Sequence, residues 1–423
     1  MSLGLLRRGA RVRYLTARAP GQARAEHREG IEITRLGGRF TVYPLALGWL
    51  FAHRRSFGAV LDCQNGIPFF TPLVLPRRVP VLCVMHHVHD AQFGLHFPRL
   101  IALAGRLLEG PAARRAYRRH ACVAVSLSTV ATMRERLRWG GDIYVIPNGV
   151  AADRSADASP AARQASSAAR QASPVAPQDH PVLVWVGRLV AHKRAGQVLD
   201  IAERLRDTGV VIDVVGRGPG GGPLSGEITA RGLDGVVRLR GFLPETEKQA
   251  LVAGALLHLN TSRGEGWGLC VLEAAALGVP TVAYDVDGLR DAVRDRETGW
   301  LVSGGELIED VAERAVKELA DPGRRGEITA ACRAWASQFG WERSAERMAA
   351  LLGAAIERGT ARGSHPGAWV MGYRERGRDR TVVAEGPVRD IVAERGAHAA
   401  VLRPAEPLER LLGRVIEEAG RPF

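Results

Sequence analysis

The sequence lacks any apolar run of the ~18 residues that a membrane-spanning helix needs. Thr41–Phe51 is apolar but short, contains Pro44 and is followed by His53-Arg54-Arg55. Met1–Ala10 has no apolar core of the kind found in secretory signal peptides. These absences argue against an integral helical membrane protein and predict a cytoplasmic chain.

Cysteine is scarce, with five residues in a chain of 423. The cysteines are odd in number, dispersed and without a Cys-x-x-Cys pair: Cys63, Cys83, Cys122, Cys270 and Cys332. This pattern excludes a disulfide-dense scaffold and favours reduced thiols in the cytoplasm. The hydrophobic content of 46% and charged content of 24% are typical of a globular chain, and its length predicts two or three domains.

Aromatic residues make up only 6% of the chain, and acidic residues are outnumbered, which leaves a net charge of +13. Nucleic acid is not predicted as a partner, because no recognition motif is present and aromatics do not alternate with the basic cluster. Arg114, Arg115, Arg118 and Arg119 fall at helical spacing after Pro111. That stripe predicts an anionic partner, either the inner face of a membrane or a phosphorylated acceptor, with a solvated basic helix face as the alternative.

The most informative motif that is present is Glu265-Gly-Trp-Gly-Leu-Cys-Val-Leu-Glu273. The apolar segment Ala255–Asn260 precedes it and Gly278 follows it, which predicts a strand, a glycine loop, a helix and a helix stop. Ligands of open α/β sheets bind at such turns, beyond the carboxyl ends of the strands. The first N–H groups of the helix favour an anion, and Gly266 and Gly268 let a ligand approach the backbone closely.

The two carboxylates of this motif stand eight residues apart and cannot serve the same anion, because like charges repel. Carboxylate oxygens accept hydrogen bonds, so they suit sugar hydroxyls. Glu273, about a turn into the helix, would hold a ribose, and Glu265, in the loop, would hold a second ring. A ligand with hydroxyls at both ends and phosphate between them is a nucleotide-sugar. The alternative is a solvated loop glutamate beside an ordinary helix glutamate.

Two further expected strands end in glycine turns. Val182–Val186 is followed by Gly187-Arg188 and Lys193, and Val210–Val215 is followed by Gly216. Arginine offers a planar fork for two phosphate oxygens and lysine a mobile point charge, so the pair would stabilise a departing diphosphate. The alternatives are that Arg188 and Lys193 are simply solvated basic residues, and that the turn at Gly216 is only a tight bend.

In this order and combination the motifs resemble glycosyltransferase family 4, most specifically across residues 182–300 and more broadly across 1–357. The resemblance rests on Gly187-Arg188 with Lys193, Gly216–Gly218, Gly241–Leu243, and Glu265 with Glu273. It implies an α/β chain of the GT-B fold, with two Rossmann-like doubly wound domains facing a cleft. It also implies a transferase that uses UDP- or GDP-linked sugars and retains the configuration at the anomeric carbon.

The resemblance further implies a role for each matching residue. Arg188 and Lys193 would grip the diphosphate, Glu265 the donor sugar and Glu273 the ribose, while His86 would lie near the donor sugar. The remaining expected donor-site positions are Gly187, Gly216, Gly241, Phe242, Leu243, Gly266, Gly268, Leu269 and Cys270. No enzyme nucleophile, cofactor or metal is implied, because in this family the leaving phosphate accepts the proton of the acceptor hydroxyl.

The expected parts of the chain are an acceptor-side Rossmann-like domain (1–150), a low-complexity linker (151–180), a donor-binding domain (181–339), a crossover helix (340–357) and a tail without a family match (358–423). The strands expected in the first part are Val12–Ala17, Ile31–Leu36, Val60–Cys63, Val81–Met85, Cys122–Ser126 and Ile143–Ile146. The linker contains Ala-Ala-Arg-Gln-Ala-Ser twice, which is typical of a tolerated insertion. Within the tail, a strand–helix–strand–helix pattern is expected over Thr381–Gly420.

Compared with the family pattern, the first domain begins without its first strand and glycine loop. Ser2–Gly9 is expected to form the first helix and leads directly into the strand that follows. A start codon further upstream is the favoured explanation, and a defective relic is the other. Without that strand its sheet neighbours would lose backbone partners. A non-catalytic nucleotide-sugar-binding protein and a GT-B sugar-nucleotide epimerase therefore stand beside the transferase as alternatives.

Four potential metal ligands follow the strand expected at Val81–Met85, in the segment His86-His87-Val88-His89-Asp90. His87 and His89 would share one face of an extended strand, which permits chelation. No cysteine or glutamate cluster elsewhere completes a zinc site, so no metal is predicted. Asp285-Val-Asp287 is interpreted as a turn at a strand end rather than as a metal motif.

Overall fold

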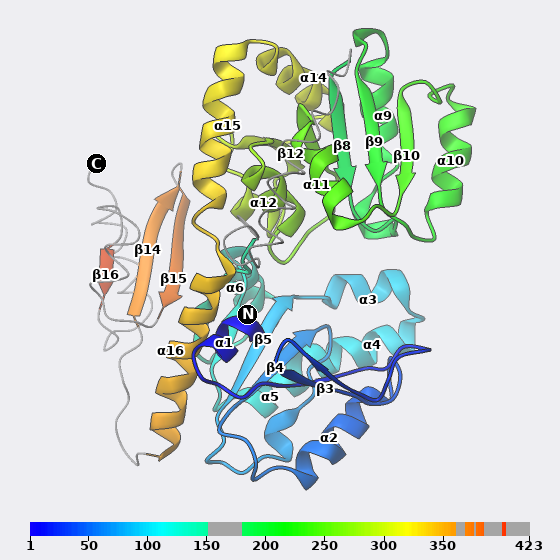
Figure 1. Ribbon diagram of the computed structural model, residues 1–423. Helices are drawn as coiled ribbons and strands as arrows, with labels where there is room; N and C mark the ends of the chain where they lie inside the picture. The colour runs from blue at the N-terminus through cyan, green and yellow to red at the C-terminus, as the bar shows by residue number, and fades with distance from the viewer. Residues whose placement is uncertain (151–179, 361–368, 376–377, 385–399, 403–423) are drawn as a thin grey trace. The chain divides into compact units, whose positions relative to one another are not determined.

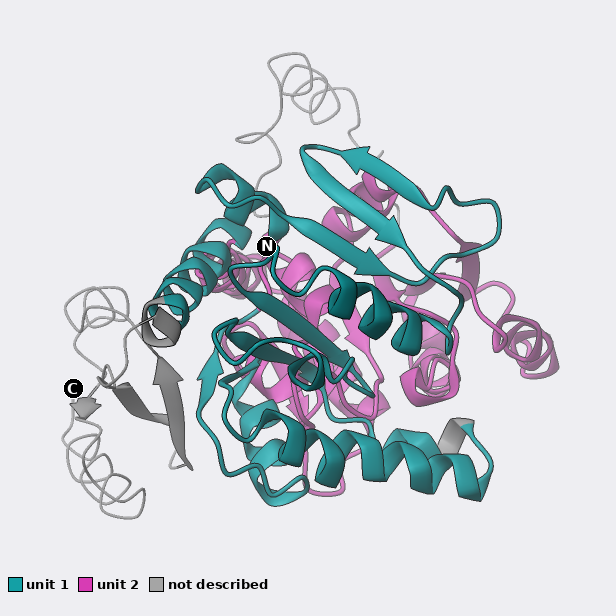
Figure 2. Cartoon of the chain, turned by 90° about the horizontal axis from the view of Figure 1, so that it is seen from below, with its two compact units in different colours: residues 1–147, 341–423 teal, residues 148–340 magenta. Residues whose placement is uncertain are grey.

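The computed structural model describes residues 1–150, 180–360, 369–375, 378–384 and 400–402. It divides the chain into two compact units, Met1–Pro147 with Trp341–Phe423 (unit 1) and Asn148–Gly340 (unit 2), which Figure 2 shows in different colours. The expected linker, apart from its last residue, lies outside the described residues. No helix in the described part of the chain is both long and apolar enough to cross a membrane.

Unit 2 is built on a parallel sheet with the strand order β10-β9-β8-β11-β12-β13 (Figure 1). Its strands are β8 (Val182–Val186), β9 (Val211–Val215), β10 (Val237–Gly241), β11 (Leu257–Asn260), β12 (Thr281–Tyr284) and β13 (Gly299–Val302). Its helices are η3 (Ala191–Lys193), α9 (Gln197–Arg204), η4 (Arg206–Thr208), α10 (Gly221–Ala230), α11 (Glu245–Ala253), α12 (Leu269–Ala276), α13 (Leu289–Ala292), α14 (Ile308–Leu319) and α15 (Pro322–Ala336). The central strands β8, β9 and β11 are buried along nearly their whole length, as expected where helices cover both faces of a parallel sheet.

The strand, loop and helix predicted around the Glu265 motif are confirmed. β11 leads into a loop, α12 begins at Leu269, and the helix ends at Ala276 just before Gly278. Gly278 adopts a φ of +87°, in the left-handed region that stops helices and that glycine adopts at little cost. β8 and β9 also form where they were expected, with β9 starting one residue later.

The described residues of unit 1 form three separate sheets. They are a four-stranded parallel sheet ordered β4-β5-β6-β7, a three-stranded sheet ordered β1-β3-β2, and a sheet in the tail. The strands of the first two sheets are β1 (Arg13–Thr16), β2 (Ala25–Arg28), β3 (Ile31–Arg35), β4 (Val60–Asn65), β5 (Val81–His87), β6 (Cys122–Ala124) and β7 (Ile143–Val145). β1 and β4 therefore each lie at a sheet edge, with one strand neighbour among the described residues. β2, which pairs antiparallel with β3, was not predicted.

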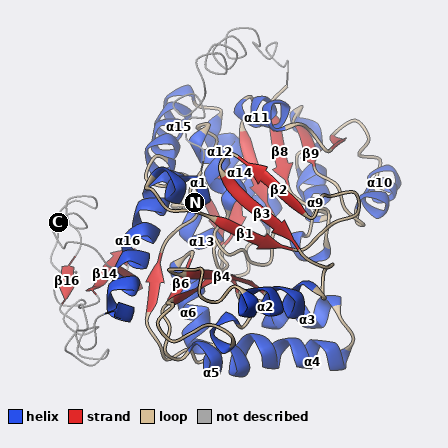
Figure 3. Ribbon diagram, turned by 60° about the horizontal axis from the view of Figure 1, so that its bottom comes forward, coloured by secondary structure: helices blue, strands red, loops and turns tan. Residues whose placement is uncertain are grey.

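The helices of unit 1 are α1 (Ser2–Arg7), α2 (Val42–Ala52), η1 (Thr71–Leu73), α3 (Asp90–His96), α4 (Arg99–Leu107), η2 (Leu108–Ala112), α5 (Ala113–Tyr117), α6 (Leu127–Glu135) and α16 (Trp341–Thr360). Figure 3 shows α4 and α5 along one face of the β4–β7 sheet. Tyr117 of α5 is fully buried there with Cys83 and Met85 of β5.

α16 is the amphipathic helix predicted after the donor domain, and it packs against α1 within unit 1. Gly4 lies so close to α16 that an added Cβ would stand 2.3 Å from that of Ala345. Leu5 of α1 is buried with Met348 and Leu351 of α16. A long amphipathic C-terminal helix thus buries its apolar face against the first helix of the chain.

The tail contains an antiparallel sheet ordered β15-β14-β16, from β14 (Trp369–Glu375), β15 (Arg378–Ala384) and β16 (Ala400–Leu402). β15 overlaps the start of the strand expected from Thr381. β14, which lies before that point, was not predicted. The helices expected in the tail lie outside the described residues.

Candidate functional site

Three glycine turns meet at the carboxyl edge of the sheet in unit 2. Gly187, after β8, donates its N–H to Val215 O at 3.0 Å, and Gly216, after β9, donates its N–H to Gly241 O at 2.7 Å. A Cβ on Gly216 would stand 1.8 Å from Gly187 O. The backbone of Gly216 has a φ of +144°, which residues other than glycine rarely adopt. The close approach of these backbones therefore requires glycine at position 216.

Lys193 and Glu265 form an ion pair at this edge, although 72 residues separate them in the sequence. Lys193 ends the short helix η3 after β8, and Glu265 lies in the loop after β11. Both side chains are mostly buried, with 16% and 19% of their surfaces exposed. Ser262 Oγ donates a second hydrogen bond to Glu265 Oε1 at 2.7 Å. A cation, a carboxylate and a hydroxyl thus meet in one cluster.

Backbone contacts hold the segment that carries Lys193 against the loop that carries Glu265. Thr261 Oγ1 donates to Lys193 O at 2.6 Å and accepts from Trp185 Nε1 at 3.0 Å. Arg194 donates from Nε to Thr261 O at 2.8 Å, and its guanidinium lies over the ring of Tyr284 at 4.1 Å. Sequence reasoning missed Thr261 and Arg194, because their partners are far away in the chain.

The loop of Glu265 is also fixed from the other side by the turn after β12. Glu265 donates its N–H to Asp287 O at 2.9 Å, and a Cβ on Gly288 would stand 2.2 Å from Glu265 O. β12 ends at Tyr284, so Asp285-Val-Asp287 is the strand-end turn that was predicted. No group of three or more metal-ligating side chains occurs anywhere in the described residues.

The helix α12 begins where the sequence predicted an anion-binding backbone. Gly268 caps this eight-residue helix in the left-handed region, with a φ of +70°, so the N–H groups of Leu269 and Cys270 lie in its first turn. Burial is the largest cause that raises the pKa of the Cys270 thiol, to about 11, so this thiol is neutral at physiological pH. Gly266, also expected here, lies in the preceding loop.

Glu273 contacts a residue that sequence reasoning missed. Lys248, on α11, lies 3.2 Å from Glu273 Oε2 and 3.1 Å from Glu245 Oε1. Burial lowers the pKa of Lys248, but the two carboxylates outweigh it and leave the pKa above its ordinary value. The lysine therefore stays charged beside the carboxylate that is predicted to hold the ribose.

The other expected donor-site residues lie near the ends of β8 and β10. Gly241 ends β10 with a φ of +66°, and Phe242 follows with 65% of its surface exposed. The Arg217 guanidinium lies 5.8 Å from the Phe242 ring centroid. Leu243 packs against the buried cluster around Val184, whereas Arg188 is exposed after Gly187. Most of the expected side chains thus gather at the loops beyond the strands.

His86 belongs to unit 1, where it is the penultimate residue of β5. Burial lowers the pKa of His86, which favours a neutral imidazole. The strand continues two residues past its expected end at Met85. His89 lies outside the strand, as the residue before α3, so the shared strand face considered for His87 and His89 is wrong. The His89 ring instead lies edge-on to that of His87, with ring centroids 5.1 Å apart.

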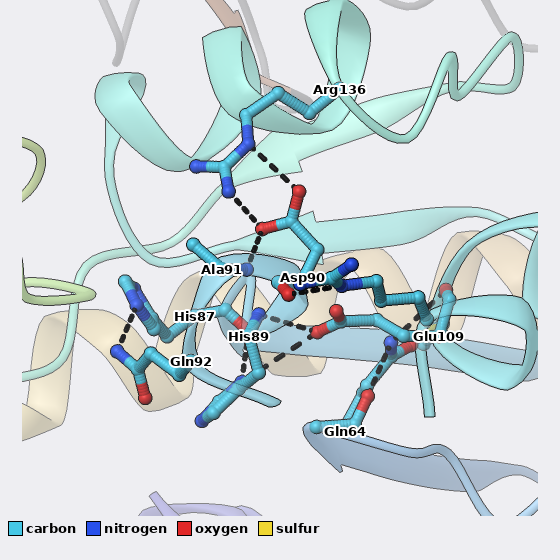
Figure 4. A network of polar contacts seen from close by, with 11 residues as sticks. Gln64, His87, His89, Asp90, Ala91, Gln92, Glu109 and Arg136 are labelled. Atoms are coloured by element: carbon cyan, nitrogen blue, oxygen red, sulfur yellow. Dashed lines mark hydrogen bonds and ion pairs between the residues drawn. The ribbon is translucent and has the colours of Figure 1, made fainter. Parts of the chain in front are cut away.

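A buried carboxylate braces this histidine loop (Figure 4). Glu109 accepts the backbone N–H of His89 at 2.6 Å, and the same oxygen lies 3.6 Å from His89 Nδ1. The Glu109 side chain is wholly buried, and its second oxygen has no hydrogen-bond partner among the described residues. Burial is the main cause that raises the pKa of Glu109.

Glu109 lies on η2, a single π-helical turn between α4 and α5 that contains Pro111. Such turns are rare and are frequently found at functional sites. Asp90, at the start of α3, is also held by two arginines. Arg136 Nε donates to its carboxylate at 2.9 Å, and Arg106 Nε donates to its backbone carbonyl at 2.9 Å. Sequence reasoning missed Glu109, although the Gly110-Pro111 that follows marks an interruption in the helix.

Comparison with known proteins completes the description of these two units. Residues 1–154 match the family description Glycosyltransferase Family 4, and residues 167–335 match Glycosyl transferases group 1. The chain belongs to glycosyltransferase family 4. It is 36% identical over 250 residues to a D-inositol 3-phosphate glycosyltransferase of Geodermatophilus obscurus, covering 54% of this chain and 52% of the relative. The relative of that name in Mycobacterium tuberculosis H37Ra is 36% identical over 189 residues, 41% of this chain and 37% of the relative.

This chain spans about half the length, or less, of the curated relatives that it matches. Among solved structures it is similar to sucrose-phosphate synthase from Thermosynechococcus elongatus, with a TM-score of 0.66, 19% identity and coverage of 83% and 90%. It is also similar to HepE of Anabaena in complex with UDP and glucose, with a TM-score of 0.57, 21% identity and coverage of 76% and 86%. The fold is GT-B, as the resemblance implied.

Proposed function

We propose that this chain is a glycosyltransferase that moves a sugar from a nucleotide-diphosphate donor to a hydroxyl acceptor, with retention at the anomeric carbon. The observation that carries the proposal is the Lys193–Glu265–Ser262 cluster at the carboxyl edge of the unit 2 sheet. It lies among glycine turns and in the same loop as the α12 N-terminus. A diphosphate and a sugar need such neighbours, which are cations, free N–H groups and a hydrogen-bond-accepting carboxylate.

Each group has a chemical task in this reaction. Breaking the bond between sugar and phosphate develops negative charge on the diphosphate, which Arg188, Lys193 and the α12 N–H groups stabilise. Glu265 accepts hydrogen bonds from the donor sugar, and Glu273 accepts them from the ribose. The leaving phosphate takes the proton of the attacking hydroxyl on the same face of the sugar, so no enzyme nucleophile is required.

The donor is proposed to be UDP-linked first and GDP-linked second, because HepE, a protein of the same fold, was solved with UDP and glucose. The acceptor is proposed to be an anionic hydroxyl compound. Relatives named for D-inositol 3-phosphate make a phosphorylated cyclic polyol the first acceptor to assay. We also propose that turnover needs no metal ion, so activity should persist in a chelator, and that the protein works in the cytoplasm with peripheral contact to the inner membrane face.

The deciding experiment measures donor binding and turnover with Lys193→Ala. We expect kcat to fall about 100-fold with little change in KM, because the lysine charge acts mainly on the leaving group. Lys317→Ala is the matched control, since Lys317 pairs with Glu313 on the surface of α14 and is 70% exposed. An unchanged kcat in Lys193→Ala would remove the lysine from the catalytic role.

Two further measurements separate the alternatives. A thermal-shift titration with UDP and GDP should show stabilisation that Glu273→Ala removes. Binding without sugar transfer would instead identify a non-catalytic nucleotide-sugar-binding protein. Conversion of the donor sugar without any acceptor would identify an epimerase.

A further inference from the structure

The segment Arg99–Arg119, which runs from α4 through η2 and α5 into the turn after Tyr117, shows an unusual distribution of side chains. We name it the α4–α5 rod, and Figure 3 labels its helices α4 and α5. Apart from Gly110, its buried positions recur at intervals of three and four residues: Ala102, Gly105, Glu109, Ala113 and Tyr117. These positions form the face turned toward the protein, so the opposite face is turned toward solvent.

The solvent-facing side of the first half is apolar. Leu100 is 82% exposed, and Ile101, Leu103 and Leu107 are 53%, 54% and 52% exposed. A surface helix normally carries polar side chains on its outward face and apolar ones inward. Here the inward face is made mostly of small residues and the outward face of leucines, which marks an interaction surface.

The second half of the rod is strongly basic. The rod carries six exposed arginines, of which Arg99 and Arg106 lie in α4 and the other four follow it: Arg114, Arg115, Arg118 and Arg119. The only acidic residue of the rod is Glu109, whose side chain is wholly buried. Arg106 and Arg114 bond to backbone carbonyls and so keep their charge uncompensated. An occupant of this surface therefore meets apolar groups and positive charge together.

We propose that the α4–α5 rod docks on an anionic lipid surface, with Leu100, Leu103 and Leu107 inserted among the acyl chains. The four arginines Arg114, Arg115, Arg118 and Arg119 would contact the headgroups. This deepens the peripheral membrane contact of the proposed function by assigning the element that makes it. A free phosphorylated compound would use the arginines but would gain nothing from the leucines. A second copy of this chain would bring six arginines against six, and the repulsion opposes self-association through this face.

The presence of both leucines and arginines on the rod predicts how membrane binding should depend on salt concentration. Apolar insertion and charge attraction both add to binding of an amphipathic helix at a membrane interface. Each arginine near an anionic surface contributes an attraction that salt screens, whereas the leucine contribution is far less sensitive to salt. Binding should therefore weaken at high salt without vanishing, and it should vanish when both groups are removed.

The test is flotation of the full chain with vesicles of phosphatidylglycerol and phosphatidylcholine in equal parts, and with vesicles of phosphatidylcholine alone. We expect strong binding to the anionic vesicles and much weaker binding to the vesicles of phosphatidylcholine alone. The triple variant L100S/L103S/L107S and the quadruple variant R114Q/R115Q/R118Q/R119Q should each weaken binding about tenfold or more. The matched controls are Leu307→Ser and Arg325→Gln, which change exposed residues of unit 2.

Several outcomes would overturn the proposal. They are no binding of the folded chain to anionic vesicles, unchanged binding of the leucine variant, or loss of binding when inorganic phosphate replaces chloride at equal ionic strength. A concentration-dependent dimer in wild type that the leucine variant abolishes would assign the face to self-association instead. The UDP thermal shift of each variant reports on folding of the donor unit. A normal UDP shift of the wild-type chain together with failed flotation of that chain would reject the docking surface and leave the transferase proposal standing.

Discussion

Unit 2 places its candidate site at the edge of one six-stranded sheet, where glycine turns bring the backbone of neighbouring strands into contact. The described residues of unit 1 form three separate sheets, and the unit holds its histidine loop through side chains, chiefly the buried carboxylate of Glu109. The first arrangement depends on backbone approach, which has almost no tolerance for an added atom. The second depends on hydrogen bonds that a similar side chain can reproduce. The two units should therefore respond differently to substitution and to pH.

The largest effect is expected for Gly216→Ala in unit 2. The new Cβ would stand 1.8 Å from Gly187 O, in a backbone conformation unsuited to alanine, so the β8 and β9 turns must separate. We expect about 3 kcal/mol of lost stability and no UDP binding. Chemical denaturation and nucleotide titration measure both.

Gly226→Ala is the control, because Gly226 lies inside α10 with open space around it. It should gain about 0.5–1 kcal/mol. Equal stability of the two variants would show that the glycine turns of unit 2 are not constrained as described.

His258 should make unit 2 lose stability as the pH falls. Burial, and then the charge of Lys193, lowers the pKa of this fully buried histidine to about 3. Below an unfolded value of about 6.5 the unfolded chain binds the extra proton, so stability should fall by about 3 kcal/mol on going to pH 4. Urea unfolding across this pH range should show a slope that His258→Asn removes. An identical slope in the variant would assign the acid sensitivity to other groups.

Glu109 should give unit 1 the opposite pH dependence. Because burial raises the pKa of Glu109, the folded chain holds its proton more tightly than the unfolded chain. Its contribution to stability is thus complete below the ordinary glutamate value of about 4.3 and is lost as the pH rises through the higher folded value. Hydrogen exchange of the segment 87–112 should show this loss in wild type and not in Glu109→Gln.

The variant Glu109→Ala tests at a single pH whether the Glu109 side chain holds the histidine loop. It removes the acceptor of the His89 N–H and should cost about 2 kcal/mol, whereas Glu109→Gln keeps an acceptor oxygen. If the alanine variant protects the histidine loop from exchange as well as wild type does, the carboxylate does not hold the loop.

The smallest effect is expected at the surface of unit 1, where Glu342 on α16 pairs with Arg7 and Arg8 on α1. These arginines keep the pKa of Glu342 below its ordinary value, but the pairs are exposed to solvent. Glu342→Gln should cost less than about 1 kcal/mol, and the difference should shrink in high salt. A larger, salt-independent loss would show that α1 relies on charge rather than on the packing of Leu5.

Local patterns in the sequence predicted much of unit 2. The apolar run Val182–Val186 and the glycine that follows each strand identify elements from a few neighbouring residues, and the structure has them there. The same approach missed β2 and β14, and it ended β5 two residues early. β2 is short and polar, and such a strand carries little periodicity of its own, because pairing with a neighbouring strand decides whether it forms.

The sequence by itself determined the α/β pattern, the glycine turns and the types of residue available for a diphosphate and a sugar. Only the tertiary structure decided which of them meet. Lys193 reaches Glu265 because β8 and β11 are neighbours in the sheet, and His89 reaches Glu109 because a π-helical turn directs that carboxylate inward. Elements form from interactions among residues close in sequence. Contacts across tens of residues depend on strand order and helix packing, which no short stretch of sequence contains.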